Sequence, residues 1–127
     1  QEVVVDGAYM AGADGSVPGL ANVEATGYVR MWKATEAGDW ATVKKEQDRL
    51  AALMRIVTVP QGVAGFGSGV GAFKTAMALL GVFDTNQMPN PVLPLKGENV
   101  KRVAAVLEEC GMTLARTPEE VSASTEA

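Results

Sequence analysis

The sequence predicts a mostly helical domain with one buried strand near its N-terminus. Apolar residues recur at steps of three and four along several segments, and glycine and proline separate those segments. One short apolar run is instead bounded by turn residues, as is typical of a buried strand. With 127 residues, 47% apolar and 20% charged, the chain is long enough to build one hydrophobic core.

The first elements follow from local patterns. Residues 3–5 have strand propensity, but apolar residues from Val4 to Ala11 recur at helical spacing, so both interpretations stay open. The run from residue 16 to 21 predicts the buried strand. Its internal Pro18 and Gly19 indicate that this strand ends at an irregular site.

A pair of antiparallel helices is expected next. Asn22 is predicted to cap the first helix, which runs to about residue 37 and ends with Gly38 in a left-handed conformation. Asp39 then caps a second helix, whose apolar stripe over residues 40–57 is polar only at Gln47. The short junction forces the two helices to fold back on each other.

The C-terminal half predicts two more helices. The third is expected over residues 72–80, after a glycine-rich stretch, and the fourth over residues 98–110, ended by Gly111. Residues 88–95 contain three prolines and form an extended connector. Residues 117–127 are small, polar and acidic, which predicts a flexible tail.

Composition excludes several classes of function. The chain has no histidine and one cysteine, which excludes Ser-His-Asp triads, Cys-His dyads, histidine-ligated zinc and an internal disulfide. A single cysteine predicts a cytoplasmic location. The net charge of −4, without a basic cluster, argues against a nucleic-acid partner. The most apolar window, residues 63–83, holds alternate glycines and a central lysine, so we expect no membrane segment.

Three motifs invite a chemical interpretation, and each has a simpler structural one. Residues 67–72 match the loose dinucleotide pattern GxGxxA, but the segment before them is predicted helical, which favours a flexible helix entry. Lys74 lies in an apolar helix, where a desolvated amine can become a Schiff-base nucleophile; a side chain reaching the surface is the favoured alternative. Cys110 is interpreted as a small core residue.

Three stretches of the chain also match a known pattern in their order and spacing. They are residues 12–23 (GADGSVPGLANV), residues 34–40 (ATEAGDW), and residues 71–111, which run from GAFKTAMALLG through PVLPL to the last helix. Together they resemble the C-terminal part of the dihydrodipicolinate synthase/N-acetylneuraminate lyase family. The first stretch looks like the family's last barrel strand, and the second resembles its helix-Gly-Asp-helix junction.

The resemblance implies an α/β fold, a (β/α)8 barrel followed by a helical C-terminal extension, assembled as a homotetramer. Because such a barrel needs about 250 residues, this chain is expected to hold only the seventh helix, eighth strand, eighth helix and extension, and by itself to be mostly α. The implied division is residues 1–37 as the end of the barrel, 38–116 as the extension and 117–127 as the tail.

The family's members are class I pyruvate-dependent lyases. The resemblance implies that a lysine on the sixth strand forms a Schiff base with pyruvate or another 2-oxo acid, and that a tyrosine on the fifth strand shuttles protons. Both residues, and a Thr-Thr turn that binds the substrate carboxylate, would lie upstream of Gln1. Lys74 matches a lysine of the extension and not the nucleophile. No catalytic residue, cofactor or metal is therefore expected in this chain.

Three substrate-binding positions carry over from the resemblance. Val17 matches the position whose backbone carbonyl faces the Schiff-base lysine. Pro18 and Gly19 match positions at the mouth of the barrel that contact substrate. Pro18 stands where some members have serine, so a side-chain hydrogen bond from this position is lost.

The functional prediction is the C-terminal portion of a Schiff-base-forming lyase, most similar to dihydrodipicolinate synthase and inactive alone. Its expected partners are the missing N-terminal barrel portion, identical subunits and a pyruvate-like substrate. A helical protein-interaction or regulatory module without catalysis is the alternative from a different class.

Overall fold

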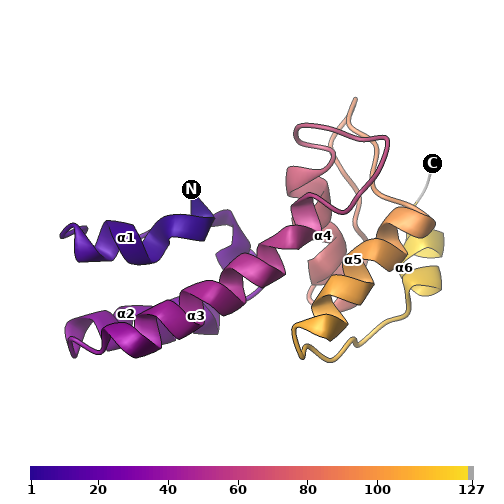
Figure 1. Ribbon diagram of the computed structural model, residues 1–127. Helices are drawn as coiled ribbons and strands as arrows, with labels where there is room; N and C mark the ends of the chain where they lie inside the picture. The colour runs from indigo at the N-terminus through magenta and orange to yellow at the C-terminus, as the bar shows by residue number, and fades with distance from the viewer. Residues whose placement is uncertain (126–127) are drawn as a thin grey trace. The chain divides into compact units, whose positions relative to one another are not determined.

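The computed structural model describes residues 1–125, and every regular element within them is helical (Figure 1). The chain divides into two compact units, the first spanning Gln1–Met54 and the second beginning at Arg55. The prediction of a mostly helical chain is therefore confirmed. The family-implied division at residue 37 concerns the complete barrel and stays a prediction.

The first unit is built around a helical hairpin. Gly38 takes the left-handed conformation, with φ of 69°, and the Asp39 side chain accepts a hydrogen bond from the Thr42 amide at 3.2 Å, so the predicted junction is confirmed. Helices α2 and α3 pack against each other and α1 lies against both. The elements of this unit are η1 (Glu2–Val4), α1 (Val5–Met10), η2 (Gly19–Asn22), α2 (Ala25–Glu36) and α3 (Trp40–Leu53).

The core of this unit forms between the hairpin and η2. Leu20 of the short η2 is fully buried, as are Met31 of α2 and Leu50 of α3, and η2 packs against α2. Burying a leucine or methionine side chain contributes about 1.5–3 kcal/mol, so one residue can fix this 3₁₀ turn against the helices.

The expected strand over residues 16–21 is absent from the part of the chain described by the structure. Residues 16–18 are without regular structure, Pro18 has extended backbone angles, and η2 follows at Gly19. A strand needs a neighbour to pair its N–H and C=O groups, and residues 1–125 supply none. Of the two interpretations of the first residues, the helical one is correct, since η1 and α1 occupy them.

The cap of α2 also differs from the expectation. Glu24, not Asn22, occupies the N-cap, and its carboxylate accepts a hydrogen bond from the Gly27 amide at 3.1 Å. Asn22 instead donates from Nδ2 to the carbonyl of Gly19 at 3.0 Å. The chain completes η2 before α2 begins, which moves the cap two residues along.

The second unit packs its helices around a proline-rich connector. Helix α5 begins at Glu98 as predicted, whereas α4 begins at Gly69 instead of residue 72. Apolar residues of both helices are fully buried, among them Leu79 and Leu107. The elements are η3 (Met54–Val57, which crosses the boundary of the units), α4 (Gly69–Leu79), α5 (Glu98–Glu109) and α6 (Pro118–Ser124).

A buried asparagine ties this unit together. Asn86 is fully buried and donates from Nδ2 to the Thr75 hydroxyl at 2.9 Å and to the Leu95 carbonyl at 2.8 Å. Its Oδ1 accepts a hydrogen bond from the Thr125 hydroxyl. Helix α4, the connector and the end of α6 thus share one satisfied polar group, as a buried amide requires.

The structure differs from the predicted flexible tail over most of its length. Thr117 and Glu120 form a capping box, with Pro118 at the first helical position, and Val121 is fully buried. Helix α6 is therefore held by a cap at its start and an apolar anchor in its middle. Residues 126–127 lie outside the described residues.

Candidate functional site

Val17 and Pro18 end the segment that connects α1 to η2, and Gly19 is the first residue of η2, so the three residues mark the turn into that element. The Val17 side chain is completely exposed, with a relative accessibility of 103%, while Pro18 and Gly19 are half-buried. None of the three carries a side chain that can transfer a proton. Their contribution to chemistry is therefore limited to shape and to backbone hydrogen bonds.

A small hollow adjoins this turn. Its volume is about 170 Å³. That is well below the roughly 300–1,000 Å³ of complete small-molecule sites, so this hollow by itself is too small to enclose a substrate. The hollow is lined by Gln1, Glu2, Val5, Ser16, Val17 and Pro18.

Hydrogen bonds connect this turn to the start of the chain and, through it, to α3. The Gly19 amide donates to Oε1 of Glu2 at 3.0 Å. Gln47 of α3, 3% exposed, donates from Nε2 to the Glu2 carbonyl and accepts from the Asp6 amide, each at 3.0 Å. Gln47, which the sequence marked as the polar residue in an apolar stripe, thus connects α3 to the start of the chain through buried hydrogen bonds.

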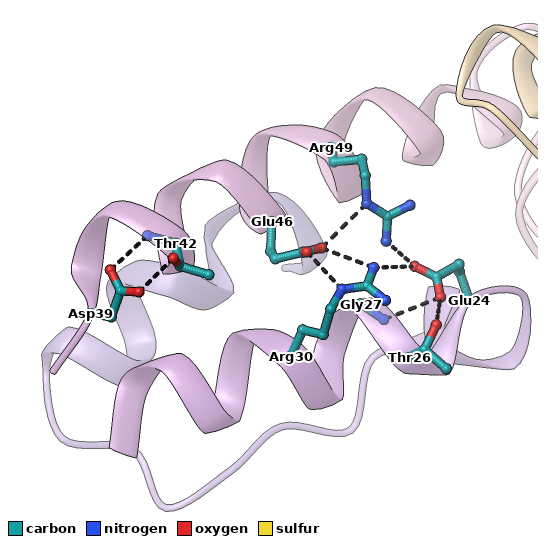
Figure 2. Close-up of polar contacts among 8 residues, drawn as sticks. All are labelled: Glu24, Thr26, Gly27, Arg30, Asp39, Thr42, Glu46 and Arg49. Atoms are coloured by element: carbon teal, nitrogen blue, oxygen red, sulfur yellow. Dashed lines mark hydrogen bonds and ion pairs between the residues drawn. The ribbon is translucent and has the colours of Figure 1, made fainter. Parts of the chain in front are cut away.

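Four charged residues join the start and middle of α2 to α3 (Figure 2). Arg30 makes a two-point contact with Glu46, with Nε–Oε1 at 2.7 Å and Nη2–Oε2 at 3.2 Å. Arg49 contacts the same Glu46 carboxylate from Nε at 3.2 Å and also contacts Glu24. Two positive and two negative charges cancel, so this cluster is a structural clamp between the helices and not an acid–base pair.

The clamp perturbs both carboxylates in the same direction. Burial alone would raise the pKa of Glu24, but hydrogen bonds from Thr26 and Arg49 outweigh it and hold that pKa below its usual value. The Arg30 hydrogen bond is the main cause of the lowered pKa of Glu46. Both side chains stay ionised in the folded protein at neutral pH.

One buried hydroxyl lacks a hydrogen-bond partner in the described structure. Tyr28 of α2 is 6% exposed, and its hydroxyl oxygen makes no hydrogen bond there. Burial raises the pKa of Tyr28 to about 12. Nearby, the hydroxyls of Tyr9 and Ser16 hydrogen-bond at 2.6 Å, and the Tyr9 ring meets the Trp32 ring edge-on at 5.0 Å between centroids.

The other candidates of the sequence lie in the second unit. The Lys74 amine donates to the carbonyl of Gln87 at 3.0 Å, so this half-buried side chain is anchored on the residue that precedes the connector. Residues 67–72 enter α4 without a preceding strand, which removes the geometry that a dinucleotide site needs. Cys110, expected in the core, is half-buried at the end of α5.

Residues 1–125 contain neither a cluster of metal-ligating side chains nor a membrane-spanning helix. No group of three or more histidine, cysteine, aspartate or glutamate side chains lies together within this range as a metal site would require. None of its helices is both long and apolar enough to cross a membrane.

Comparison with known proteins identifies the family. The model of the Dihydrodipicolinate synthetase family matches residues 1–110, so the chain belongs to this family of class I aldolase lyases, and the predicted resemblance is confirmed. The family implies that the chain is part of a (β/α)8 barrel protein.

A curated relative gives the extent of the match. The chain is similar to the 4-hydroxy-tetrahydrodipicolinate synthase of Kineococcus radiotolerans, with 34% identity over 102 residues. That alignment covers 80% of this chain and 31% of the relative. The chain therefore spans about a third of the length of the curated relative that it matches.

Proposed function

We propose that this chain is the C-terminal portion of a Schiff-base-forming lyase that acts on pyruvate or another 2-oxo acid, in the manner of dihydrodipicolinate synthase. One observation carries the proposal: residues 1–110 match the family, yet the alignment reaches only 31% of the relative's length. The alternation of helix and strand needed for a barrel requires about 250 residues, so the remainder must come from another segment of polypeptide.

In this proposal the chain contributes one wall of the substrate site. Val17 presents its backbone carbonyl toward the Schiff-base lysine, and Pro18 and Gly19 contact the substrate. The complete exposure of the Val17 side chain and the small volume of the adjoining hollow support this assignment. An incomplete substrate site is expected to leave such residues exposed until the rest of the barrel covers them.

The chain alone is inactive in this proposal. Schiff-base formation needs an amine that attacks the keto carbon and expels water, and the family resemblance places that lysine upstream of Gln1. Lys74, the one lysine of the sequence that invited a chemical role, is anchored on the Gln87 carbonyl in the second unit.

Reductive trapping tests this point. The purified chain is incubated with pyruvate and sodium borohydride, and its intact mass is measured. We expect no adduct, while the complete Kineococcus radiotolerans synthase, treated in parallel, gains one. A stable adduct on this chain, mapped to Lys74 and abolished by Lys74→Arg, would contradict the proposed division of labour.

The proposed partner is the N-terminal barrel portion, which supplies the lysine, the tyrosine and the carboxylate-binding turn. The test mixes this chain with the N-terminal two thirds of the same relative. A complex on size-exclusion chromatography that traps pyruvate on the partner fragment is the expected result. Absence of binding to the soluble partner fragment would overturn this pairing. A cytoplasmic location and assembly of the complete protein as a homotetramer belong to the same proposal.

A second candidate function is a helical interaction or regulatory module without catalysis. The observation in its favour is that residues 1–125 fold into two helical units without a strand. Intact-mass measurement of the protein in its source cells separates the two. A mass of roughly twice 13.2 kDa or more, as a barrel of about 250 residues requires, supports the lyase. A native product of 13.2 kDa supports the module.

A further inference from the structure

The candidate substrate segment is tied to a residue near the start of the chain. The Gly19 amide donates to Oε1 of Glu2 at 3.0 Å, across 17 positions of sequence. A hydrogen bond to a carboxylate is about twice as strong as one between neutral groups. Because Gly19 directly follows the extended Pro18, this bond ties the backbone to Glu2 at the point where the chain turns into η2.

The backbone at Glu2 is in turn fixed by Gln47 of α3. The Gln47 side chain uses both ends of its amide, donating to the Glu2 carbonyl and accepting from the Asp6 amide, each at 3.0 Å. It is 3% exposed, so water cannot replace these bonds without opening the packing. The contacts span 45 and 41 positions of sequence.

We propose that Gln47 and Glu2 are positioning residues, which set the conformation of Pro18 and Gly19 through one continuous series of hydrogen bonds. Gln47 of α3 thereby influences the conformation of Pro18 and Gly19 without touching them, because its hydrogen bonds go to Glu2 and Asp6. This inference rests on the proposed function, because it is that function which makes Pro18 and Gly19 substrate contacts. The series itself belongs to the first unit and is measurable on this chain without any catalysis.

Amide hydrogen exchange, followed by NMR on the 127-residue chain, tests the inference. Glu2→Ala removes the acceptor and should accelerate exchange of the Gly19 amide about tenfold or more, the effect of losing one charge-assisted bond. Glu2→Gln keeps a side-chain carbonyl oxygen and should restore most of the protection. Glu36→Ala, at the exposed end of α2, is the matched control and should leave the Gly19 amide unchanged.

The decisive variant changes Gln47, which does not touch Gly19. Gln47→Glu keeps the acceptor for the Asp6 amide and loses the donor to the Glu2 carbonyl, so the Gly19 amide should again exchange several-fold faster. In the double variant Glu2→Ala/Gln47→Glu, exchange should be no faster than in Glu2→Ala alone, because both changes break the same series.

Two results would overturn the inference. One is normal Gly19 protection in Gln47→Glu beside lost protection in Glu2→Ala. The other is an equal acceleration at Gly19 and at core amides such as that of Leu50, which would mean general loosening of the unit. Since no substrate is used, failure here leaves the lyase proposal standing, and failure of pyruvate trapping leaves the positioning series standing.

Discussion

At the scale of single residues, Gly27 has no side chain and so leaves room for the contact between Glu24 and Arg49. A Cβ at this position would lie 2.5 Å from Nη2 of Arg49 and 2.5 Å from Oε2 of Glu24, and 3.0 Å from a methyl group of Leu50. The glycine sits inside α2, where alanine is favoured by about 1 kcal/mol. Its presence there reflects the close approach of the two helices.

We therefore expect Gly27→Ala to push the side-chain ends of Glu24 and Arg49 out of contact and to press on Leu50. These losses should outweigh the helix preference for alanine and leave the first unit less stable by about 1 kcal/mol. Urea unfolding followed by tryptophan fluorescence measures this, because Trp32 and Trp40 both belong to the first unit. Gly7→Ala is the matched control, since a Cβ at Gly7 of α1 meets nothing within 4 Å. Stability equal to or above that of the unchanged chain in Gly27→Ala would contradict the packing argument.

The Tyr28 hydroxyl predicts a pH-dependent effect. Its pKa is raised to about 12 in the folded protein against 10.0 ordinarily, so the unfolded chain loses this proton first. Stability is complete below pH 10 and falls as pH rises toward 12, by about 2–3 kcal/mol. Tyr28→Phe should remove this fall and, by deleting an unpartnered hydroxyl, add about 1 kcal/mol at pH 7. Urea unfolding at pH 7 and at pH 11 provides the comparison, and an unchanged alkaline slope in Tyr28→Phe would refute it.

At the scale of elements, local signals explain most of what was predictable. The Gly38–Asp39 junction follows from a left-handed glycine and a side-chain cap within two residues of each other. Helix α5 follows from its apolar stripe, which is buried, and from the left-handed Gly111 after its end. The prediction of a strand over residues 16–21 was wrong because a strand also needs a pairing neighbour, and residues 1–125 form no other strand. Leu20 instead joins the helical core.

Helix α6 was predictable in principle. Thr117 and Glu120 carry the Thr-x-x-Glu signature of a capping box, and Pro118 suits the first helical position. The acidic, small-residue composition of the segment suggested a tail and hid this signal. Its anchor, Val121, is one apolar residue whose burial depends on packing within the second unit.

This element provides a direct test of the cap. Thr117→Ala should cost the helix about 1 kcal/mol and raise exchange of the α6 amides, including that of Val121, several-fold. Thr113→Ala, at an exposed position outside any helix, is the control and should have little effect. Hydrogen exchange read by mass spectrometry resolves the two, and equal protection of α6 in both variants would show that the cap contributes nothing.

The residues of the candidate site also divide into those that order along the chain revealed and those that depend on long-range contacts. Val17, Pro18 and Gly19 were found through the family resemblance, which depends on order along the chain. Glu2 and Gln47 were missed as site residues, because their bonds join positions 17 to 45 residues apart. One signal did mark Gln47: it is the polar residue within the apolar stripe of its helix.

At the scale of the whole molecule, the two units should differ in how they respond to a barrel partner. Residues 16–18 carry no regular structure in the chain alone, so the amides of Ser16 and Val17 should exchange rapidly, while Pro18 has no amide hydrogen. Adding the N-terminal two thirds of the relative should protect them, because strand pairing occupies their N–H groups. Amides of α5 in the second unit serve as the internal control and should not change. Strong protection of Val17 in a verified monomer would contradict the barrel interpretation.

The burial of Leu20 has a geometric consequence for any such pairing. Side chains alternate between the two faces of a strand, so a strand over residues 16–21 that kept Leu20 against the helices would turn Val17 to the opposite face. In the chain alone the Val17 side chain is fully exposed, so it is free to take that position. A slip by one residue would expel Leu20 from the core and bury Val17 in its place. The burial of Leu20 would therefore fix the pairing register of this segment, so that a neighbouring strand could align with it in one way only, before any substrate binds.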